Sequence, residues 1–385
     1  MVVAIYYDSY LFKDYIYKEI KFPQHITKHE YNIIEEYKSS TADLKIAFTT
    51  SRYAVDFEID ETSNHAGCPA TNFNQRIVLL SDISDMVFSF DGEIHNHYYD
   101  IWKECDRTNI FWAIPGTVNF DSNLRSRVIN YMDHFLTQAN LYKREPQKEL
   151  LKNLNYEIPK LKYFDALLGL KRQHRDFVFN LIQESGLVEK SITTYIGAGD
   201  NVPPNTDSEF FIWPTDIEFG ADRTKEMFLQ SFHTCNGVKY CDITVPLSKI
   251  IPIDIYNQTA YTIVAETNFD NGYSFYTEKT AKPMLARRLF VAFSGQYFLR
   301  NLREFGFRTF GDVIDESYDE IADHETRWTM AFEQVKKLCT LDQLQVYNKI
   351  KETLDHNYNL LNNNWLAVLA SQIEKKIQNI IQPTQ

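Results

Sequence analysis

The chain has 385 residues, a formal net charge of -12 and a hydrophobic content of 44%, with 24 Tyr and 27 Phe. This apolar content excludes a globally disordered protein, and the length exceeds what one hydrophobic core supports, so we expect more than one domain. The acidic balance argues against bulk electrostatic capture of nucleic acid. The five cysteines are scattered and the start is unlike a secretory leader, so we expect a cytoplasmic protein. No long apolar run is present, so we expect no membrane span.

The first part of the chain alternates short β-rich runs with polar segments that leave room for crossover helices. Strands are predicted for DLKIAFTTS, QRIVLLS, MVFSFDG and NIFWAIPG, and residues 125–141 have roughly helical apolar spacing. The charged segment 143–159 carries a proline near each end, which is typical of a boundary. We therefore expect an N-terminal α/β domain over residues 1–158.

A second α/β set follows. KYFDALLGL predicts a strand, HRDFVFNLIQESGL predicts a helix with Gly186 as its C-cap, and SITTYIG, EFFIWP, YTIVAET and RLFVAFSG predict further strands. We expect this α/β domain over residues 159–335 and a helical extension over residues 336–385. The fold class is α/β, and two Rossmann-like domains facing a cleft, with C-terminal helices, are the economical architecture.

The segment NGYSFYTEKTAKP, residues 271–283, contains the groups that a diphosphate site needs. Thr277 is placed to cap a helix that begins at Glu278, where backbone N–H groups and the helix dipole attract an anion. Lys279 adds a positive charge at the same point, and the Glu278 carboxylate can accept hydrogen bonds from ribose or sugar hydroxyls. The same spacing is also typical of a capped, charge-balanced helix start on a surface.

The longer stretch VAETNFDNGYSFYTEKTAKPMLARRLFVAFSG resembles the donor-binding motif of the fucosyltransferase family, in which a strand end is followed by Y-x-T-E-K and a helix. The resemblance implies the GT-B architecture, with the nucleotide sugar held by the C-terminal domain and the acceptor by the N-terminal one. It places Tyr276, Thr277 and Lys279 among the donor-binding residues and gives Glu278 a part in catalysis by orienting the ribose or sugar. Asn268 matches the family's asparagine if a small insertion is allowed. Residues 297–318 are similar to bacterial and phage-encoded glycosyltransferase-like proteins.

In such enzymes an arginine on the helix after the first donor-domain strand contacts the diphosphate. The resemblance assigns this role to Arg175 in KRQHRDFVFNLI, with His174 beside it. Basic residues at a helix start oppose the helix dipole unless an anion binds there. A solvated basic face is the alternative. With Lys279, Arg175 would form a two-point clamp on a diphosphate.

A direct, inverting transfer needs a carboxylate or histidine that takes the proton from the acceptor hydroxyl. In FSFDGEIHNHYYD, Glu93 resembles the T-G-E element that carries the proposed base in fucosyltransferases, with Asp91 in place of the threonine. His95 and His97 lie two apart, so a histidine base or a metal set with Glu93 is an alternative. GT-B enzymes as a class need no obligatory metal, and we expect neither a metal nor a cofactor beyond the nucleotide sugar.

Two other groupings receive ordinary interpretations. Asp315, Glu316 and Asp319 lack a histidine or a D-x-D pattern, so we interpret them as capping and turn groups. Cys235 and Cys241 lack the spacing of a structural zinc site and are interpreted as packing thiols. No Walker A sequence or G-x-G-x-x-G fingerprint is present, which argues against P-loop and dinucleotide-binding enzymes.

The sequence therefore predicts a metal-independent, inverting glycosyltransferase that moves a sugar from a nucleoside diphosphate sugar to a hydroxyl of a glycan or another acceptor. Two alternatives stay open. One is a catalytically inactive nucleotide- or glycan-binding protein of the same fold. The other is a glycosyltransferase of phage DNA bases, against which the net charge argues. The expected compartment is the cytoplasm, or the host cytoplasm for a phage-encoded chain. The sugar, the acceptor and the oligomeric state stay open.

Overall fold

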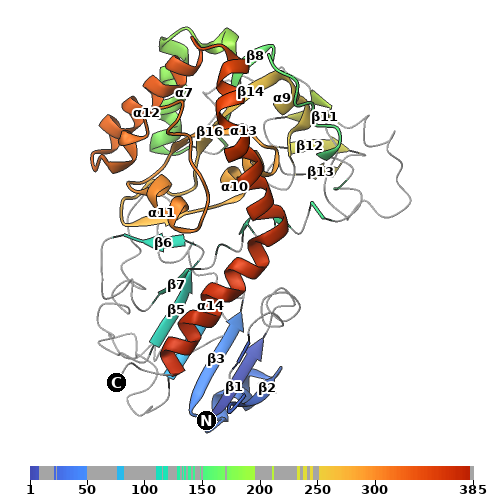
Figure 1. The fold of residues 1–385 in the computed structure, drawn as a ribbon, viewed down its shortest axis with the longest axis vertical. Helices are drawn as coiled ribbons and strands as arrows, with labels where there is room; N and C mark the ends of the chain where they lie inside the picture. Colours follow the sequence, from blue (N-terminus) through green and yellow to red (C-terminus); the bar gives the residue numbers. More distant parts are fainter. Residues whose placement is uncertain are drawn as a thin grey trace. The chain divides into compact units, whose positions relative to one another are not determined.

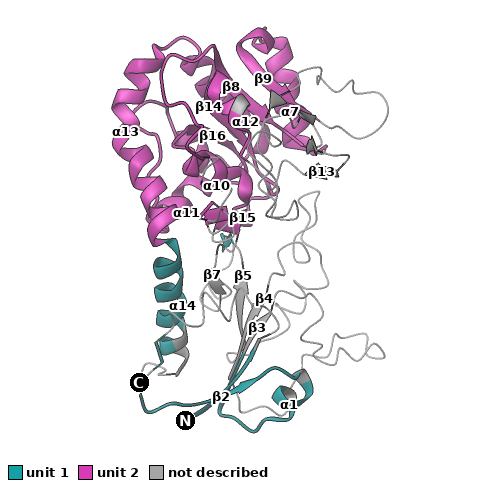
Figure 2. Cartoon of the chain, turned by 90° about the vertical axis from the view of Figure 1, so that its right-hand side faces the viewer, with its two compact units in different colours: residues 1–133, 365–385 teal, residues 134–364 magenta. Residues whose placement is uncertain are grey.

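The computed structural model describes residues 1–7, 21–22, 24–49 and 76–81, short stretches between 110 and 148, residues 151–195 except 170, short strands between 210 and 245, and residues 251–381. The chain divides into two compact units (Figure 2). One is formed by Met1–Asp133 with Trp365–Gln385, and the other by His134–Asn364. The domain boundaries expected at 158/159 and 335/336 stay predictions.

The first unit is built on a six-stranded sheet in the order β2-β1-β3-β4-β5-β7, in which every neighbouring pair is parallel. Val3, Ala4 and Ile5 are buried in succession, as are residues 44–46. Such continuous buried runs are typical of parallel sheets covered on both faces. The elements are β1 (Val2–Tyr7), β2 (Thr27–Tyr31), β3 (Leu44–Thr49), β4 (Arg76–Ser81), β5 (Ile110–Ile114), β6 (Gly116–Val118), β7 (Val128–Asn130), α1 (Ile34–Ser39) and α14 (Trp365–Ile381) (Figure 1).

Three of the strands predicted in this unit are confirmed, since DLKIAFTTS, QRIVLLS and NIFWAIPG contain β3, β4 and β5. The helix predicted over residues 125–141 is wrong at its start, because β7 lies there and Val128 pairs with Trp112 of β5. The β-branched Val128 and Ile129 favour a strand, and pairing with β5 outweighs a helical spacing of apolar residues. The run MVFSFDG lies outside the described residues.

The second unit contains a four-stranded parallel sheet in the order β16-β14-β8-β9. All seven residues of β14 and all five of β16 are buried, so these strands form the centre of the core. All four strands of this sheet were predicted; they are β8 (Lys162–Leu167), β9 (Ser191–Thr194), β14 (Thr259–Ala265) and β16 (Leu289–Phe293). The short strand β15 (Tyr273–Phe275) lies outside this sheet. A separate antiparallel sheet contains β10 (Phe210–Phe211), β11 (Phe232–Thr234), β12 (Gly237–Tyr240) and β13 (Ile243–Val245).

Helices cover the parallel sheet and complete the unit. Helix α7 connects β8 to β9 and ends at Glu184 with Ser185 as its C-cap. Gly186, predicted as the C-cap, follows directly, and its φ of 68° is a backbone conformation that glycine favours. Helix α12 contacts α7 and β16, and α13 contacts α10. The C-terminal part of the chain is helical, as predicted. The helices are α7 (Gln173–Glu184), α9 (Ile253–Gln258), α10 (Glu278–Leu285), α11 (Phe298–Glu304), α12 (His324–Leu338) and α13 (Gln343–Asn359), with 3₁₀ turns at Val188–Lys190 and Ser317–Glu320 and a π-helical turn at Leu360–Asn364.

The order of the strands creates a switch point between β8 and β14. From β8 the chain passes through α7 to β9 on one side, whereas from β14 it passes through α10 to β16 on the other. In open parallel sheets, ligands bind outside the carboxyl ends of the strands at such a point. The mixed α/β class with parallel sheets is thus confirmed, and two domains facing a cleft stay a prediction. Within the part of the chain that the structure describes, no helix combines the length and apolarity needed to span a membrane.

Candidate functional site

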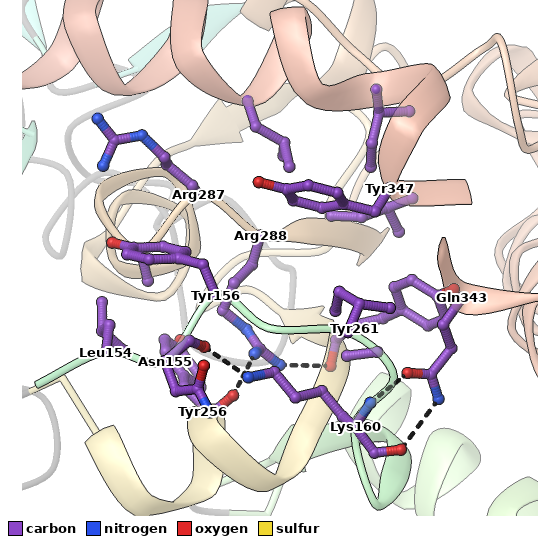
Figure 3. A pocket seen from close by; sticks show the side chains of 16 residues that line it. Leu154, Asn155, Tyr156, Lys160, Tyr256, Tyr261, Arg287, Arg288, Gln343 and Tyr347 are labelled. Carbon is purple, nitrogen blue, oxygen red and sulfur yellow. Dashed lines mark hydrogen bonds between the residues drawn. The ribbon is translucent and has the colours of Figure 1, made fainter. Parts of the chain in front are cut away.

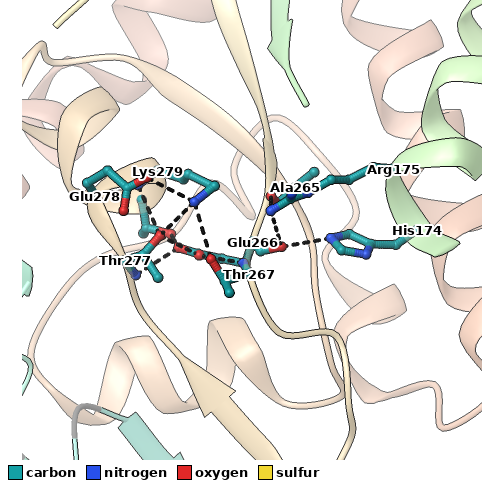
Figure 4. Close-up of polar contacts among 9 residues, drawn as sticks. His174, Arg175, Ala265, Glu266, Thr267, Thr277, Glu278 and Lys279 are labelled. Atoms are coloured by element: carbon teal, nitrogen blue, oxygen red, sulfur yellow. Dashed lines mark hydrogen bonds and ion pairs between the residues drawn. The ribbon is translucent and has the colours of Figure 1, made fainter. Parts of the chain in front are cut away.

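Glu266 directly follows β14 at the carboxyl edge of the sheet, and its side chain is fully buried. Its Oε1 accepts hydrogen bonds from the backbone N–H of Thr277 at 3.0 Å and from the hydroxyl of Thr280 at 2.6 Å. Its Oε2 accepts from the hydroxyl of Thr277 at 2.7 Å and from the backbone N–H of Thr267 at 3.0 Å. Four donors therefore bind one carboxylate and fix the start of α10 against the end of β14 (Figure 4).

The start of α10 has the capped geometry that the sequence predicts. Thr277 is the N-cap in an extended conformation, and its hydroxyl oxygen accepts from the backbone N–H of Lys279 at 3.3 Å. The Lys279 ammonium donates to the Glu278 carboxylate at 2.9 Å and to the hydroxyl of Thr267 at 3.2 Å. The side chains of Lys279 and Glu278 stay 22% and 13% exposed. A partly accessible cation thus lies at the positive end of a helix.

The charges on the first turns of α10 influence one another. Burial by itself would raise the pKa of Glu278, but the neighbouring Lys279 and Lys282 outweigh it and hold that pKa at about 2. Glu278 is therefore ionised at neutral pH and acts only as a hydrogen-bond acceptor. Lys282 is buried, and burial lowers its pKa to about 8 even though Glu278 lies nearby. The carboxylate of Glu278 is thus surrounded by positive charge.

Arg175 and His174 reach the same strand end from the first turn of α7. Arg175 is 3% exposed, and its Nη2 donates to the backbone carbonyl of Glu266 at 3.2 Å and to that of Ala265 at 3.4 Å. Burial lowers the pKa of Arg175 to about 10, which leaves the guanidinium charged at neutral pH. The Nε2 of His174 lies 2.8 Å from the Glu266 carbonyl.

His174 is neutral in this position. Its burial, together with the charge of Arg175, lowers the pKa of the imidazole well below its usual value. Because the Glu266 carbonyl can only accept, Nε2 carries the proton of the neutral ring and donates it there. His174 also contacts the rings of Phe269 and Trp328, with centroids 4.9 and 5.9 Å apart. These contacts hold the ring in the core beside the strand end.

The structure brings together most of the residues predicted for the donor site. Figure 4 shows Arg175 and His174 on one side of Glu266, and Thr277, Glu278 and Lys279 on the other. Glu266 itself, which contacts both groups, was not predicted as a site residue. The available signal was a carboxylate placed directly after a buried apolar strand.

Two further predicted residues have contacts inside the fold. The Asn268 amide donates to the carbonyl of Tyr273 at 2.6 Å and its oxygen accepts from the backbone N–H of Asp270 at 3.2 Å, so it shapes the loop before β15. The buried Tyr276 hydroxyl donates to the carbonyl of Phe298 at 2.7 Å. A donor-binding role for Asn268 and Tyr276 stays a prediction. Next to Glu266, the hydroxyl of Thr267 accepts a hydrogen bond from the Lys279 ammonium.

The predicted base lies outside the described residues. Glu93, Asp91, His95 and His97 all belong to the stretch 82–109, so the roles considered for them stay predictions. Cys235 and Cys241 lie outside the described residues too. Among the residues that are described, no three His, Cys, Asp or Glu side chains form a group that could hold a metal ion.

The acidic residues that follow α11 act as capping and turn groups, as predicted. Asp319 accepts from the backbone N–H of Leu299 and of Arg300, both at 2.8 Å. Glu316 accepts from the backbone N–H of Phe310 at 2.6 Å, and Asp315 accepts from that of its neighbour in the turn, Ser317, at 2.9 Å. Their carboxylates therefore satisfy backbone donors.

The solved structures that are similar to this chain include two of α1,3-fucosyltransferases. A crystal structure of an α1,3-fucosyltransferase with GDP shares 13% sequence identity, with 100% of this chain and 91% of that chain covered, at a TM-score of 0.42. A second crystal structure of an α1,3-fucosyltransferase shares 12% identity, with 93% and 90% covered, at a TM-score of 0.34. No family model matches the chain, and no curated protein matches it by sequence. Because both TM-scores are below 0.5, function is inferred from the site residues.

A small pocket lies elsewhere in the second unit, beside the residues where β14 and β16 begin (Figure 3). Tyr156, Lys160 and Arg287 line it, and its volume is about 30 Å³, room for about two water molecules. Arg288 also lines it, but its Nη2 donates to the Asp165 carboxylate at 2.7 Å. The pocket is too small for a nucleotide, and the carboxyl edge of the sheet is the better candidate site.

Proposed function

We propose that this protein transfers a sugar from a nucleoside diphosphate sugar to an acceptor hydroxyl. One observation carries the proposal: Arg175 and the capped helix start that bears Lys279 are both bound to Glu266, at the switch point of a parallel sheet. When a glycosidic bond to a diphosphate breaks, the leaving group gathers negative charge. Fixed cations and a helix N-terminus stabilise such charge.

The proposed roles follow from the protonation states. Arg175 and Lys279 bind the diphosphate, and Arg175 supplies its charge at neutral pH because its pKa of about 10 lies well above that range. Glu278, ionised because its pKa is about 2, accepts hydrogen bonds from ribose or sugar hydroxyls and orients the donor. In this proposal Glu93 deprotonates the acceptor, the transfer inverts the anomeric centre, and no metal takes part.

A binding screen tests the proposal first. Nucleoside diphosphates and their sugars are added to the full chain, and a ligand of the native state raises the melting temperature. The affinity of each ligand found is then measured calorimetrically for Lys279→Ala and Arg175→Ala. Loss of one charge-assisted contact should weaken binding on the order of tenfold to a hundredfold.

The control is Lys336→Ala. Lys336 lies on α12, its side chain is 42% exposed, and it forms an ion pair with Glu333 at 2.5 Å. The affinity of this variant should equal that of the wild type. A folded wild-type protein that binds no nucleoside diphosphate or nucleotide sugar contradicts the proposal. Binding without release of nucleoside diphosphate in the presence of varied acceptors would instead favour an inactive nucleotide-binding protein.

A further inference from the structure

We infer that Glu266 is the positioning residue of this site, setting both cation-bearing segments from a single point on the sheet. Its carboxylate fixes the helix start that carries Lys279, and its backbone carbonyl binds Arg175, which lies 91 residues away in the chain. The inference rests on the proposed function, and it assigns a role to a buried acid that contacts no ligand itself.

A carboxylate is required here because of what faces each oxygen. Oε1 faces the backbone N–H of Thr277, and Oε2 faces the backbone N–H of Thr267. A backbone N–H cannot become an acceptor. A glutamine at this position would therefore direct its NH₂ group at a donor in either orientation, and one backbone group would lose its partner.

The carboxylate also sets the direction of the helix cap. Because it only accepts, the Thr277 hydroxyl must donate its proton to Oε2. The lone pairs of that hydroxyl are then directed at Lys279, whose backbone N–H lies at 3.3 Å and whose Nζ lies at 3.5 Å. If the Thr277 hydroxyl had to accept instead, the cap of α10 and its contact with the Lys279 ammonium would both be weakened.

The backbone of Glu266 connects this cap to α7. Its carbonyl accepts from the Nε2 of His174 at 2.8 Å and from Arg175 at 3.2 Å, while the Thr280 hydroxyl binds the side chain from the first turn of α10. A shift of this residue therefore changes the distance between the two cations. Misplacement of a binding group by about 1 Å can reduce the rate of a reaction on the order of a hundredfold.

The experiment compares two buried carboxylates of the same sheet. Glu266→Gln and the control Asp165→Asn are made in the full chain, and calorimetric affinities for GDP, UDP, ADP and CDP are measured well below each melting temperature. Asp165 is as buried as Glu266, but it binds Arg288, Thr259 and Thr262. Glu266→Gln should weaken binding of the nucleotide that the wild type prefers at least tenfold, and Asp165→Asn should leave it unchanged.

A second pair of variants, with smaller changes, tests the positioning role where Glu266→Gln or Asp165→Asn fails to fold. Thr280→Val and Thr262→Val each remove one buried hydroxyl that donates to a buried carboxylate, at 2.6 Å to Glu266 and at 3.1 Å to Asp165. Valine keeps the shape of threonine. Thr280→Val should weaken nucleotide binding severalfold and raise the KM for the donor without raising that for the acceptor, whereas Thr262→Val should change neither.

The outcomes separate this inference from the proposed function. A folded wild-type protein without affinity for any nucleoside diphosphate overturns both. If the wild type binds and Lys279→Ala weakens binding, but Glu266→Gln and Thr280→Val keep wild-type affinity, the positioning role is wrong and the function stands. Equal weakening in Asp165→Asn and Thr262→Val would show a general effect of core substitutions and would also overturn the positioning role.

Discussion

The hydroxyl of Thr277 donates to the carboxylate of Glu266 at 2.7 Å, across 11 residues of chain, and both side chains are buried. This bond ties the start of α10 to the end of β14. The cation of the candidate site, Lys279, therefore lies on a helix whose N-cap residue is bound to the core of the unit. Stability and binding are coupled at this point, so every variant needs a control that separates the two.

The cap of α10 should depend on the hydroxyl of Thr277 rather than on its shape. Thr277→Val removes both the bond to Glu266 and the cap of Lys279, and should lower the free energy of unfolding by about 1–3 kcal/mol. Thr277→Ser keeps both bonds and should cost less than half as much. Chemical denaturation of the two variants measures the difference. Equal losses would mean that the methyl group contributes as much as the hydroxyl, which would contradict this prediction.

Glu278 should make stability depend on pH in the acid range. Its folded pKa of about 2 lies below the usual 4.5, so its contribution is fully present above pH 4.5 and is lost as the pH falls through 2. The full contribution is on the order of 3 kcal/mol. In urea unfolding at pH 6, 5, 4 and 3, the stability difference between wild type and Glu278→Gln should be nearly the same at pH 6 and 5 and should shrink at pH 4 and 3.

Glu333→Gln serves as the control for that series, because Glu333 is an exposed carboxylate paired with Lys336 on α12. Exposed pairs of this kind contribute about 0–1 kcal/mol. Its stability difference from the wild type should stay small at every pH. A gap between wild type and Glu278→Gln that does not change between pH 6 and 3 would argue against the depressed pKa.

The buried pair of Asp165 and Arg288 should be far more sensitive than a surface pair of similar length. Asp165→Asn leaves the 6% exposed Arg288 without its carboxylate at 2.7 Å and should cost about 3–5 kcal/mol. Asp355→Asn breaks an ion pair with Arg287 at 2.8 Å, in which the Asp355 side chain is 47% exposed and the Arg287 side chain 27%. This change should lower the free energy of unfolding by at most about 1 kcal/mol. Comparable losses in denaturation would contradict the role of burial.

Gly295 should tolerate no side chain, for a reason different from that at Gly186. A Cβ at Gly295 would lie 2.1 Å from the backbone oxygen of Asp270, so the loop after β16 would have to move, and Gly295→Ala should cost more than about 2 kcal/mol. At Gly186 a Cβ would meet nothing within 4 Å, so alanine there should lower the free energy of unfolding only through the strain of its positive φ of 68°, by about 1–2 kcal/mol. A larger melting-temperature loss for Gly186→Ala would reverse this order.

Part of the candidate site could be predicted because its signals are local. A threonine before Glu278 and Lys279 predicts a capped helix start, and the structure has that cap. Gly186 after an amphipathic stretch predicts the end of α7. Each pattern involves residues within one or two turns of one another, where backbone conformation and hydrogen bonding depend mainly on neighbours in the sequence.

Other features were decided by pairing between distant segments. The helical spacing over residues 125–141 did not reveal β7, because a strand gains its hydrogen bonds from a neighbour, here β5. Likewise the contact between the Thr267 hydroxyl and Lys279 joins residues 12 apart in the chain, and it depends on Glu266 fixing the end of β14 against the start of α10.

By itself, then, the sequence determined the α/β class, the helix that bears Lys279 and the basic start of α7, because apolar periodicity and helix capping depend on residues close together in the chain. Only the tertiary structure decided that Arg175 and the helix start that bears Lys279 are both bound to Glu266. The partners of Glu266 lie between 1 and 92 residues away, and only the parallel order of β8 and β14 brings them to one strand end.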